Sequence, residues 1–276
     1  MSLIKIPSRI WLFFRRAWKL SGLGFSARDK ALIIWSYFFF SLLRLLGGNY
    51  ASRAPKFFRL YFRGETTPFY FRGLPDFYML EGIFLGGEYD IDLPEEPEVI
   101  FDLGSNVGVG TLFFKLRYPK ARIFAYEPDP NNKDIFEKNM EPFKDSVIFS
   151  DSAVVGTPKE KVEFFVSGEP WSSSLFAGKD KTGKKVVCNA VTLDGEIKKH
   201  GINRIDILKF DIEGAEEEVF AHFEGLPKVL YAVGELHVDL IKKTVEDFCA
   251  LFPGFALVYR TAKAKRPTVL LKNTRI

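Results

Sequence analysis

Acidic and imidazole side chains that can take up a proton follow two largely apolar segments in the second half of the chain. Asp211 and Glu213 come directly after residues 205–210, and His237 follows residues 228–235. A carboxylate or a neutral imidazole can accept the proton of a hydroxyl group as that oxygen attacks an electrophile. We predict Asp211, Glu213 and His237 as the catalytic residues, with His237 as the base that suits neutral pH.

The roles within this group stay open at the level of sequence. Asp211 is also suited to bind the amino group of a cofactor, and His237 to a structural, hydrogen-bonded position at a strand end. The hard oxygens of Asp211, Glu213 and Glu235 would suit Mg²⁺, but the chain shows no compact ligand motif, and we predict no metal. The acids at residues 216–218 are typical of the first turn of a helix, where the helix dipole favours them.

A glycine-rich turn between an apolar segment and a predicted helix forms a candidate cofactor site. Residues 99–103 precede the turn, and the largely apolar residues 111–116 follow it. This order predicts the strand, turn and helix that open a βαβ unit. Glycines let a ligand approach the backbone, and the helix N-terminus offers free N–H groups. The predicted cofactor-binding residues of this segment are Asp102, Gly104, Ser105, Asn106 and Gly108.

The positions of the glycines bear on which cofactor binds. A dinucleotide fingerprint would need glycine at positions 104, 106 and 109, whereas the chain has Asn106 and Val109. A nucleoside without phosphates, such as S-adenosylmethionine (SAM), needs less room at the turn. Glu127 ends the next apolar segment about twenty residues beyond the turn, at the spacing where a carboxylate meets ribose hydroxyls. The alternative role of such an acid is to cap the helix that follows.

Three segments of the chain together resemble the FkbM family of SAM-dependent O-methyltransferases. They are Asp102–Gly108, Tyr126–Asp129 and Leu208–Glu216. Gly234–His237 is similar to that family's next strand end, and the resemblance spans about residues 75–260. The first and third segments are specific in combination, whereas either one alone is a weak signal.

This resemblance implies an activity, a cofactor and an acceptor. The activity is methyl transfer from SAM to a hydroxyl group of a sugar, a glycolipid or a related secondary metabolite. The cofactor site would include Glu127 and Asp129, and the adenine would lie beside Asp151, Ser152 and Ala153. The acceptor atom must be held about 3 Å from the methyl carbon, in line with the bond to sulfur.

Apolar segments separated by helical patterns recur through the chain and predict an α/β fold. The predicted strands are residues 98–103, 121–127, 146–150, 205–211, 228–235, 255–260 and 267–272. Only residues 261–266 join the last two, which is too short for a parallel crossover, so these strands must form an antiparallel hairpin. We predict a class I SAM-methyltransferase (Rossmann-like) fold, with a seven-stranded, mostly parallel sheet that ends in this hairpin. A Rossmann-type dehydrogenase would end with another βαβ unit.

The long connection between residues 151 and 204 departs from this alternation. Residues 161–166 and 185–191 have the pattern of two additional strands, and Thr192 is suited to cap a helix that ends near His200. Between the two strands lies Trp171 with three serines, a combination that suits contact with a sugar. An ordinary polar loop with one packed tryptophan explains the same residues equally well. Connections of this length often cover a functional site.

The first quarter of the chain is basic and aromatic, unlike the rest. Residues 1–74 hold 13 Lys and Arg against two acids, whereas residues 75–276 hold 26 against 33. We predict two domains with these bounds: an extension of helices and a β-hairpin (residues 57–73), then the methyltransferase domain. The acidic charge of the second domain, with no motif for nucleobase methylation, argues against a nucleic-acid substrate.

Residues 1–50 allow two interpretations. Residues 31–43 carry no charge for thirteen positions, which falls short of the roughly 20 that a spanning helix needs. Tryptophan, phenylalanine and basic residues here favour binding in the plane of an anionic membrane, where the acceptor would be lipid-linked. The alternative is a helical cap or a homodimer contact whose aromatic side chains are core residues.

The two cysteines, Cys188 and Cys249, are far apart and in no metal or redox spacing. They fit a reducing compartment, and we expect a cytoplasmic protein, peripheral to the inner membrane face if residues 1–50 bind it. Two other functions stay open: an NAD-dependent oxidoreductase of the Rossmann type, and a binding protein without turnover. The turn and the closing hairpin argue against the first, and Glu127 and Asp211 argue against the second.

Overall fold

The computed structural model describes residues 5–47, 51–166, 184–263 and 265–276. The chain divides into two compact units. The N-terminal unit comprises Met1–Asp90, Val107–Arg117 and Ile135–Pro142, and the sheet unit comprises Ile91–Asn106, Tyr118–Asp134 and Phe143–Ile276. The division into an extension and a methyltransferase domain at residue 74 stays a prediction.

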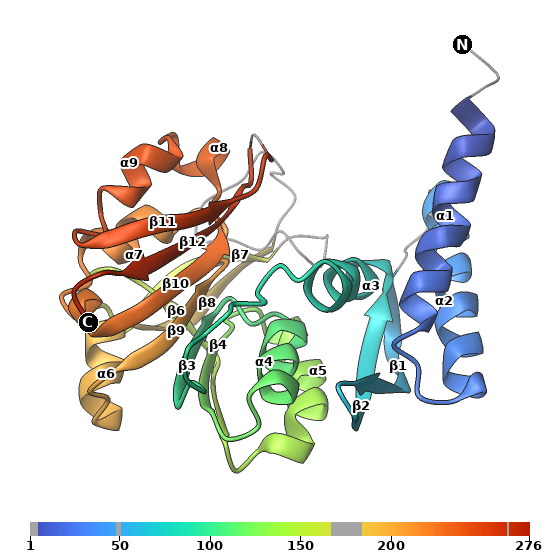
Figure 1. Cartoon of the computed structure of the whole chain (residues 1–276), viewed down its shortest axis with the longest axis horizontal. Helices are drawn as coiled ribbons and strands as arrows, with labels where there is room; N and C mark the ends of the chain where they lie inside the picture. The colour runs from blue at the N-terminus through green and yellow to red at the C-terminus, as the bar shows by residue number, and fades with distance from the viewer. Residues whose placement is uncertain (1–4, 48–50, 167–183, 264) are drawn as a thin grey trace. The chain divides into compact units, whose positions relative to one another are not determined.

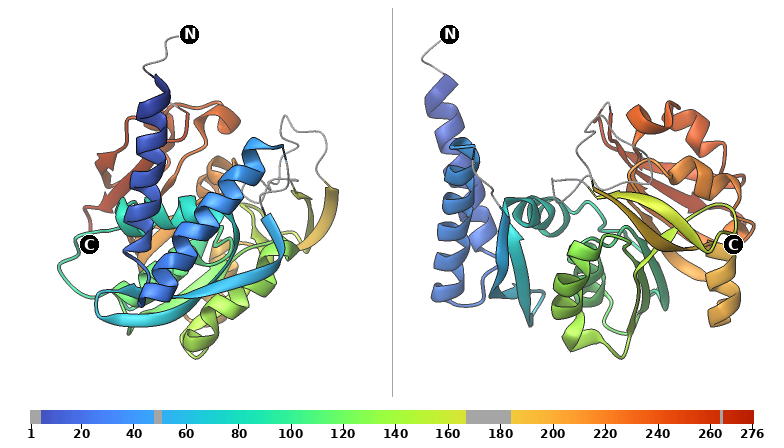
Figure 2. Two further views of the ribbon diagram at one scale, coloured as in Figure 1. Left: turned by 90° about the vertical axis from the view of Figure 1, so that its right-hand side faces the viewer. Right: turned by 180° about the vertical axis from the view of Figure 1, so that it is seen from behind.

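The N-terminal unit consists of helices and a β-hairpin (Figure 1). Its elements are α1 (Lys5–Ser21), α2 (Ala27–Leu45), β1 (Ala51–Phe62), β2 (Glu65–Gly73), α3 (Leu74–Leu80), the π-helical turn η1 (Glu81–Leu85), α4 (Val109–Arg117) and the end of α5 (Pro130–Met140). The antiparallel pairing of β1 with β2 confirms the predicted hairpin. The helices α1 and α2 lie side by side in both views of Figure 2, and α2 contacts the hairpin.

Polar contacts fix α2 to the hairpin. Ser26 is the N-cap of α2 and forms a capping box with Asp29, which satisfies backbone N–H groups at the start of the helix. The Asp29 carboxylate also accepts a hydrogen bond from the backbone N–H of Arg59 at 3.0 Å and pairs with the Arg59 side chain. Within the described ranges, every helix is too short or too polar to cross a membrane.

The sheet unit is built on seven strands in the order β11-β12-β10-β9-β3-β4-β5 (Figure 1). Their bounds are β3 (Val99–Leu103), β4 (Arg122–Tyr126), β5 (Val147–Ser150), β9 (Ile205–Phe210), β10 (Val229–Glu235), β11 (Phe255–Arg260) and β12 (Thr268–Asn273). Strand β12 pairs antiparallel with both β10 and β11, and the other neighbours are parallel. This arrangement confirms the predicted class I methyltransferase fold with its closing antiparallel hairpin.

A second sheet, in the order β6-β8-β7, follows β5 in the chain. Its strands are β6 (Ser152–Val154), β7 (Lys161–Val166) and β8 (Lys184–Val191). Strands β7 and β8 are the two additional strands predicted from the sequence. Strand β6 was not predicted, because three residues are too few to show an alternating pattern. Trp171 and its serines lie outside the described residues.

Helices of the sheet unit share one apolar core with the strands. They are α6 (Leu193–His200), α7 (Glu216–Ala221), α8 (Val238–Ile241) and α9 (Val245–Cys249), with the short 3₁₀ turn η3 (Leu226–Lys228). The 3₁₀ turn η2 (Glu141–Phe143) follows α5, and two of its three residues belong to the N-terminal unit. Thr192 caps α6 as predicted. Phe210 of β9, Phe220 of α7 and Phe248 of α9 meet in the core, with ring centroids 5.1, 5.5 and 5.7 Å apart. These rings anchor the two elements on either side of residues 211–215.

Candidate functional site

The carboxyl ends of four neighbouring strands lie at one edge of the seven-stranded sheet. Leu103 of β3 is level with Tyr126 of β4 and with Phe210 of β9, and Phe210 is level with Gly234 of β10. The residues that follow these positions therefore meet at one edge, where ligands bind in open α/β sheets. They are Gly104, Glu127, Asp211 and Glu235.

The glycine-rich turn after β3 is held against neighbouring strands by its backbone. The N–H groups of Gly104 and Ser105 both donate to the carbonyl oxygen of Tyr126, at 2.9 and 3.0 Å. Gly104 has φ +76, and a Cβ atom here would lie 1.9 Å from the carbonyl oxygen of Asp211, so only glycine fits. Asn106 also lies in the left-handed region, with φ 51. The predicted residue Gly108 belongs to the N-terminal unit and precedes α4.

A buried ion pair between Lys209 and Asp102 adjoins the turn, and the role of Asp102 in cofactor binding stays a prediction. Lys209 Nζ lies 2.9 Å from Asp102 Oδ1, and both side chains are almost completely buried. Lys209 Nζ also donates to the carbonyl oxygens of Leu103 and Gly104, at 3.2 and 2.7 Å. Burial lowers the pKa of Lys209, but the charges of Asp102 and Asp211 outweigh burial and raise it. Asp102 therefore holds the turn through Lys209, which sequence reasoning missed.

Glu127 follows β4, and its carboxylate is bound by the backbone. Its Oε2 accepts a hydrogen bond from the N–H of Asn106 at 2.8 Å, and its Oε1 accepts one from the N–H of Asp129 at 2.9 Å. Burial raises the pKa of Glu127 to about 7, although these hydrogen bonds oppose the shift. Ser105 is buried too, and its hydroxyl makes no hydrogen bond with any described residue. The buried hydroxyl of Ser105, which lacks a hydrogen bond, and the carboxylate of Glu127, which the backbone holds in place, fit a polar ligand such as SAM.

The other predicted cofactor residues follow β4 and β5. Asp129 is buried, and its Oδ1 accepts a hydrogen bond from the backbone N–H of Asn131 at 2.9 Å, as a residue at the start of α5 can. Asp151 is exposed and pairs with Lys133 at 2.9 Å. Ser152 and Ala153 are buried in β6. Their assignment to the adenine site stays a prediction.

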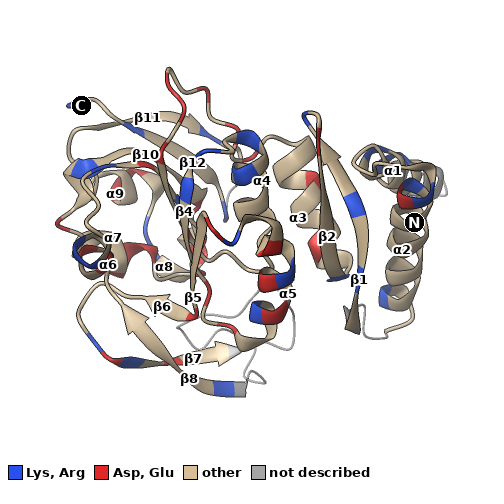
Figure 3. Cartoon of the chain, turned by 90° about the horizontal axis from the view of Figure 1, so that it is seen from below, with Lys and Arg blue, Asp and Glu red and all other residues tan. Residues whose placement is uncertain are grey.

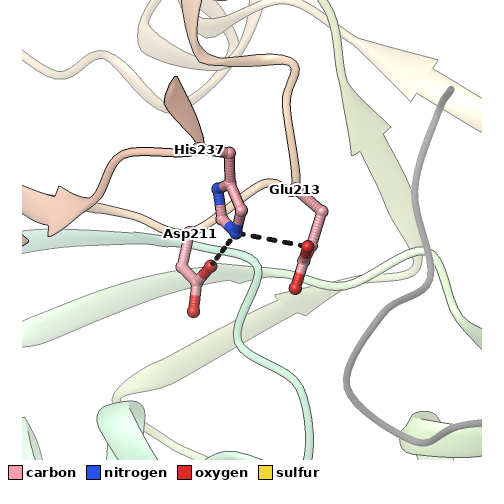
Figure 4. A group of neighbouring side chains, drawn as sticks. All are labelled: Asp211, Glu213 and His237. Carbon is pink, nitrogen blue, oxygen red and sulfur yellow. Dashed lines mark ion pairs between the residues drawn. The ribbon is translucent and has the colours of Figure 1, made fainter. Parts of the chain in front are cut away.

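The three residues predicted as catalytic meet around the imidazole ring of His237 (Figure 4). The ring is completely buried, and its Nδ1 lies 2.7 Å from Glu216 Oε1. Its Nε2 lies 3.2 Å from Glu213 Oε2 and 3.7 Å from both Asp211 Oδ1 and Glu235 Oε2. The three acids around Nε2 are partly exposed, so the cluster opens to solvent on the side of its carboxylates.

The protonation state of His237 in the cluster differs from the neutral one that a general base needs. Burial lowers the pKa of His237, but the carboxylates of Glu213, Glu216 and Asp211 outweigh burial and raise it to about 11. Burial raises the pKa of Glu213, against the opposing effect of His237. A protonated imidazole has no lone pair that could accept a proton, so this arrangement gives no support to His237 as the general base. Asp211 and Glu213 are the remaining predicted proton acceptors.

Two features of the segment after β9 were not expected. Glu216, the first residue of α7, is completely buried against His237, although its position predicts a solvated acid of a helix first turn. Glu213 has φ 51 and Gly214 has φ 103, so the backbone bends sharply before α7. Residues other than glycine rarely take this conformation, and such strain is concentrated at functional sites. The bend brings Glu213 and Glu216 to the same imidazole ring.

Two basic residues from the link between β11 and β12 reach the same carboxylates. Arg266 Nη1 lies 3.4 Å from Glu213 Oε2, and Lys263 Nζ lies 3.4 Å from Glu235 Oε1. The closing hairpin therefore contributes charge to the site as well as completing the fold. Even with His237 protonated, the four carboxylates of the cluster outnumber these cationic side chains.

Comparison with known proteins adds a family to this geometry. The sequence profile of the methyltransferase FkbM domain matches residues 102–242, just over half of the 276 residues. The matched segment holds the turn after β3, Glu127 and the cluster around His237. The chain belongs to the FkbM methyltransferase family. This confirms the resemblance drawn from the sequence motifs and identifies a methyltransferase.

Three curated relatives of this FkbM methyltransferase are themselves named methyltransferases. Methyltransferase 1 of Beauveria bassiana is 27% identical over 203 residues, which cover 66% of this chain and 77% of the relative. The 2-O-methyltransferase NoeI of Sinorhizobium fredii is 26% identical over 206 residues, covering 67% and 84%. The hexuronic acid methyltransferase AglP of Haloferax volcanii is 26% identical over 169 residues, covering 58% and 67%.

Proposed function

We propose that this FkbM methyltransferase transfers a methyl group from SAM to a hydroxyl group of a sugar, a glycolipid or a related secondary metabolite. The observation that carries the proposal is the cluster of Asp211, Glu213 and His237 at the same sheet edge as the glycine-rich turn. A hydroxyl must lose its proton when its oxygen forms the new bond, and a carboxylate at this position can take that proton. Two relatives support the acceptor class, since their names specify a 2-O-methyltransferase and a hexuronic acid methyltransferase.

The residues of the turn and of the neighbouring strand ends fit SAM, which supplies an electrophilic methyl group on its sulfonium. Ser105 offers a buried hydroxyl without a partner among the described residues. Glu127 offers a carboxylate that the backbone already holds in place, and its position suits the two ribose hydroxyls. Gly104 lets the turn pack against the backbone carbonyl of Asp211, so this strand end lies next to the turn.

The acceptor hydroxyl is assigned to the carboxylates of Asp211 and Glu213. The new C–O bond forms as the C–S bond breaks, and the hydroxyl proton passes to one of these carboxylates. His237 fixes the cluster from its buried side, and Arg266 contacts Glu213 from the opposite hairpin. Such positioning of the reacting oxygen supplies much of the rate enhancement in a displacement of this kind.

Two successive measurements test this function. Calorimetric titration of the full chain with SAM should give a micromolar Kd, or about −8 kcal/mol, and NAD should not bind. Methyl-labelled SAM, incubated with free and lipid-linked uronic acids and hexoses, should then yield one methylated acceptor. Failure of SAM to bind the folded protein contradicts the proposal. SAM binding without transfer to any hydroxyl would indicate a binding protein without turnover.

We propose further that the N-terminal unit contacts an anionic membrane surface, which would favour a lipid-linked acceptor. Trp11, Phe14 and Trp18 repeat at helical spacing on α1, and the two tryptophans are 62% and 75% exposed. Trp35 and Phe39 repeat in the same way on α2 and are also exposed. Lys and Arg positions also occur along both helices (Figure 3). Exposed aromatic rings with nearby cations are typical of helices that lie in a membrane interface.

Surface substitutions test this contact more sharply than deletion of residues 1–50, because α1 and α2 also bury core residues. The double variant Trp11→Ser, Trp18→Ser should lose binding to vesicles that contain anionic lipid and keep its affinity for SAM. Leu257→Ser, which alters an exposed apolar side chain on β11, serves as the control. Equal vesicle binding by wild type and double variant contradicts the membrane contact. A shift from dimer to monomer in the double variant would instead identify a homodimer interface.

A further inference from the structure

The donor atoms around His237 are spaced as the ligands of a metal ion are. One oxygen each of Asp211 and Glu213 and one ring nitrogen of His237 all lie within 4.8 Å of one another (Figure 4). The nitrogen is 3.2 Å from the Glu213 oxygen and 3.7 Å from the Asp211 oxygen. Two ligands at right angles are about 3.0 Å apart when the metal bonds are about 2.1 Å long, and about 3.4 Å apart for bonds of about 2.4 Å. The observed separations are close to those of neighbouring ligands.

Two of these donor atoms are buried and make no hydrogen bond with any described residue. They are Nε2 of His237 and Oδ1 of Asp211. The His237 side chain is completely buried, and its Nε2 is directed at the two carboxylates (Figure 4). A buried polar atom without a hydrogen bond costs free energy unless another group binds it. The place where such a group would bind is the space between these three side chains.

The other ring nitrogen is fixed in the way that is common for histidines that bind metals. His237 Nδ1 lies 2.7 Å from Glu216 Oε1, and both side chains are completely buried. A carboxylate that accepts the Nδ1 proton orients the ring, and a cation at Nε2 would take the place of the proton that this nitrogen carries when no cation is bound. This contact gives Glu216 a role that its place in the first turn of α7 does not reveal.

The number of carboxylates around His237 also favours a bound cation. Asp211, Glu213, Glu216 and Glu235 surround one imidazole ring. Arg266 contacts Glu213 and Lys263 contacts Glu235, each at 3.4 Å and from side chains that are themselves partly exposed. A cation between the carboxylates would be held at shorter range than either basic side chain.

We propose that Asp211, Glu213 and His237 bind one divalent cation, with Glu235 as a neighbouring donor and Glu216 as the residue that orients His237. One imidazole with two or three carboxylates suits Mn²⁺ better than Mg²⁺ or Ca²⁺, whose protein ligands are almost all oxygens. Three protein ligands also leave positions for the acceptor. The cation site stands on the geometry of the cluster, and only its role in orienting the acceptor hydroxyl rests on the proposed function.

Mn²⁺ binding to the full chain, after treatment with a chelator, tests the site without any activity assay. Free Mn²⁺ has a strong electron paramagnetic resonance signal that is lost on binding, so a titration gives the number of sites and the Kd. We expect one site per chain, and at least tenfold weaker binding in Asp211→Asn. Glu216→Gln should weaken binding about 10–100-fold, as loss of an outer carboxylate partner does. Glu246→Gln removes an exposed acid paired with Arg260 and should leave the Kd unchanged.

Absence of Mn²⁺ binding in the folded wild type overturns the proposal. So does binding that Asp211→Asn and Glu216→Gln leave unchanged. Thermal unfolding of each variant separates loss of the site from loss of the fold, and Asp211→Asn is isosteric and partly exposed. If methyl transfer from SAM continues in the presence of chelator and no Mn²⁺ binds, the cation proposal is contradicted and the proposed function stands. If the protein binds Mn²⁺ and does not bind SAM, the proposed function is contradicted and the cation site stands.

Discussion

Two groupings of charged side chains are built on the segment that includes β9, one around Lys209 and one around Asp211 and Glu213, and they differ in burial and in charge balance. Lys209 Nζ pairs with Asp102 Oδ1 and donates hydrogen bonds to the backbone carbonyl oxygens of Leu103 and Gly104. Beyond the strand end, His237 has one good partner in Glu216, while its second nitrogen faces three carboxylates without a hydrogen bond. The first grouping is balanced in charge, and the second carries excess negative charge.

We interpret this difference as that between a structural pair and a ligand site. The Lys209–Asp102 pair is almost completely buried and its two charges balance, which suits a structural role. In the cluster around His237, two buried atoms make no hydrogen bond with any described residue, and three carboxylates are partly exposed to solvent. A site that binds a ligand needs both features. The same short segment therefore fixes the turn with Lys209 and carries Asp211 and Glu213, the carboxylates to which we assign proton transfer.

Removal of Lys209 should have the largest effect on the protein. Lys209→Met leaves Asp102 as an uncompensated buried charge and releases the carbonyl oxygens of Leu103 and Gly104. Loss of one partner of a buried pair costs about 3–5 kcal/mol of the free energy of unfolding, which urea denaturation measures. SAM binding should be lost with the turn.

The matched control is a surface pair of the same length. Lys133 Nζ also lies 2.9 Å from its partner, Asp151, but both side chains are well exposed. Lys133→Met should change the free energy of unfolding by about 1 kcal/mol or less. Equal effects of the two substitutions would show that burial does not set the value of the Lys209 pair.

Neutralising Glu213 should have the opposite signature, with loss of turnover and little loss of stability. Glu213→Gln keeps the shape of the side chain and reduces the excess negative charge around His237. We expect kcat to fall at least about 100-fold, the scale of a lost acid–base group, while the Kd for SAM stays within about twofold. Glu217→Gln is the control, because Glu217 lies on α7 and pairs with Lys243 near the surface. A destabilised variant with wild-type kcat would show that the cluster is structural.

The fold and the site differ in how far sequence predicts them. The seven strands are apolar segments of ordinary length, and the six-residue link predicted between the last two is short enough to force an antiparallel hairpin. Asp211, Glu213 and His237 come together because carboxyl ends of parallel strands share an edge, and this follows from their positions in the sequence. Strand β6 is too short for its pattern to stand out.

Charge state and inward orientation escape sequence reasoning. Glu216 and Glu217 are adjacent acids in the first turn of α7, yet one is completely buried on His237 and the other pairs near the surface with Lys243. Helix spacing decides which of them faces inward, and the sharp bend at Glu213 sets where that spacing begins. The protonation of His237 depends on several carboxylates from separate segments, so its pKa follows only from their assembly in space.

Glu127 tests an intermediate case, a buried acid held by backbone N–H groups. Its pKa is raised by burial from the usual 4.5 to about 7, so the group is mostly neutral at pH 6 and ionised at pH 8. If ribose hydroxyls donate to the carboxylate, SAM should bind about tenfold more weakly at pH 6 than at pH 8. The raised pKa also means that this group makes the folded protein less stable as pH rises from about 4.5 to about 7. Calorimetry at both pH values should show the difference in Kd in the wild type and its loss in Glu127→Gln, whereas a difference that survives the substitution assigns the titration to another group.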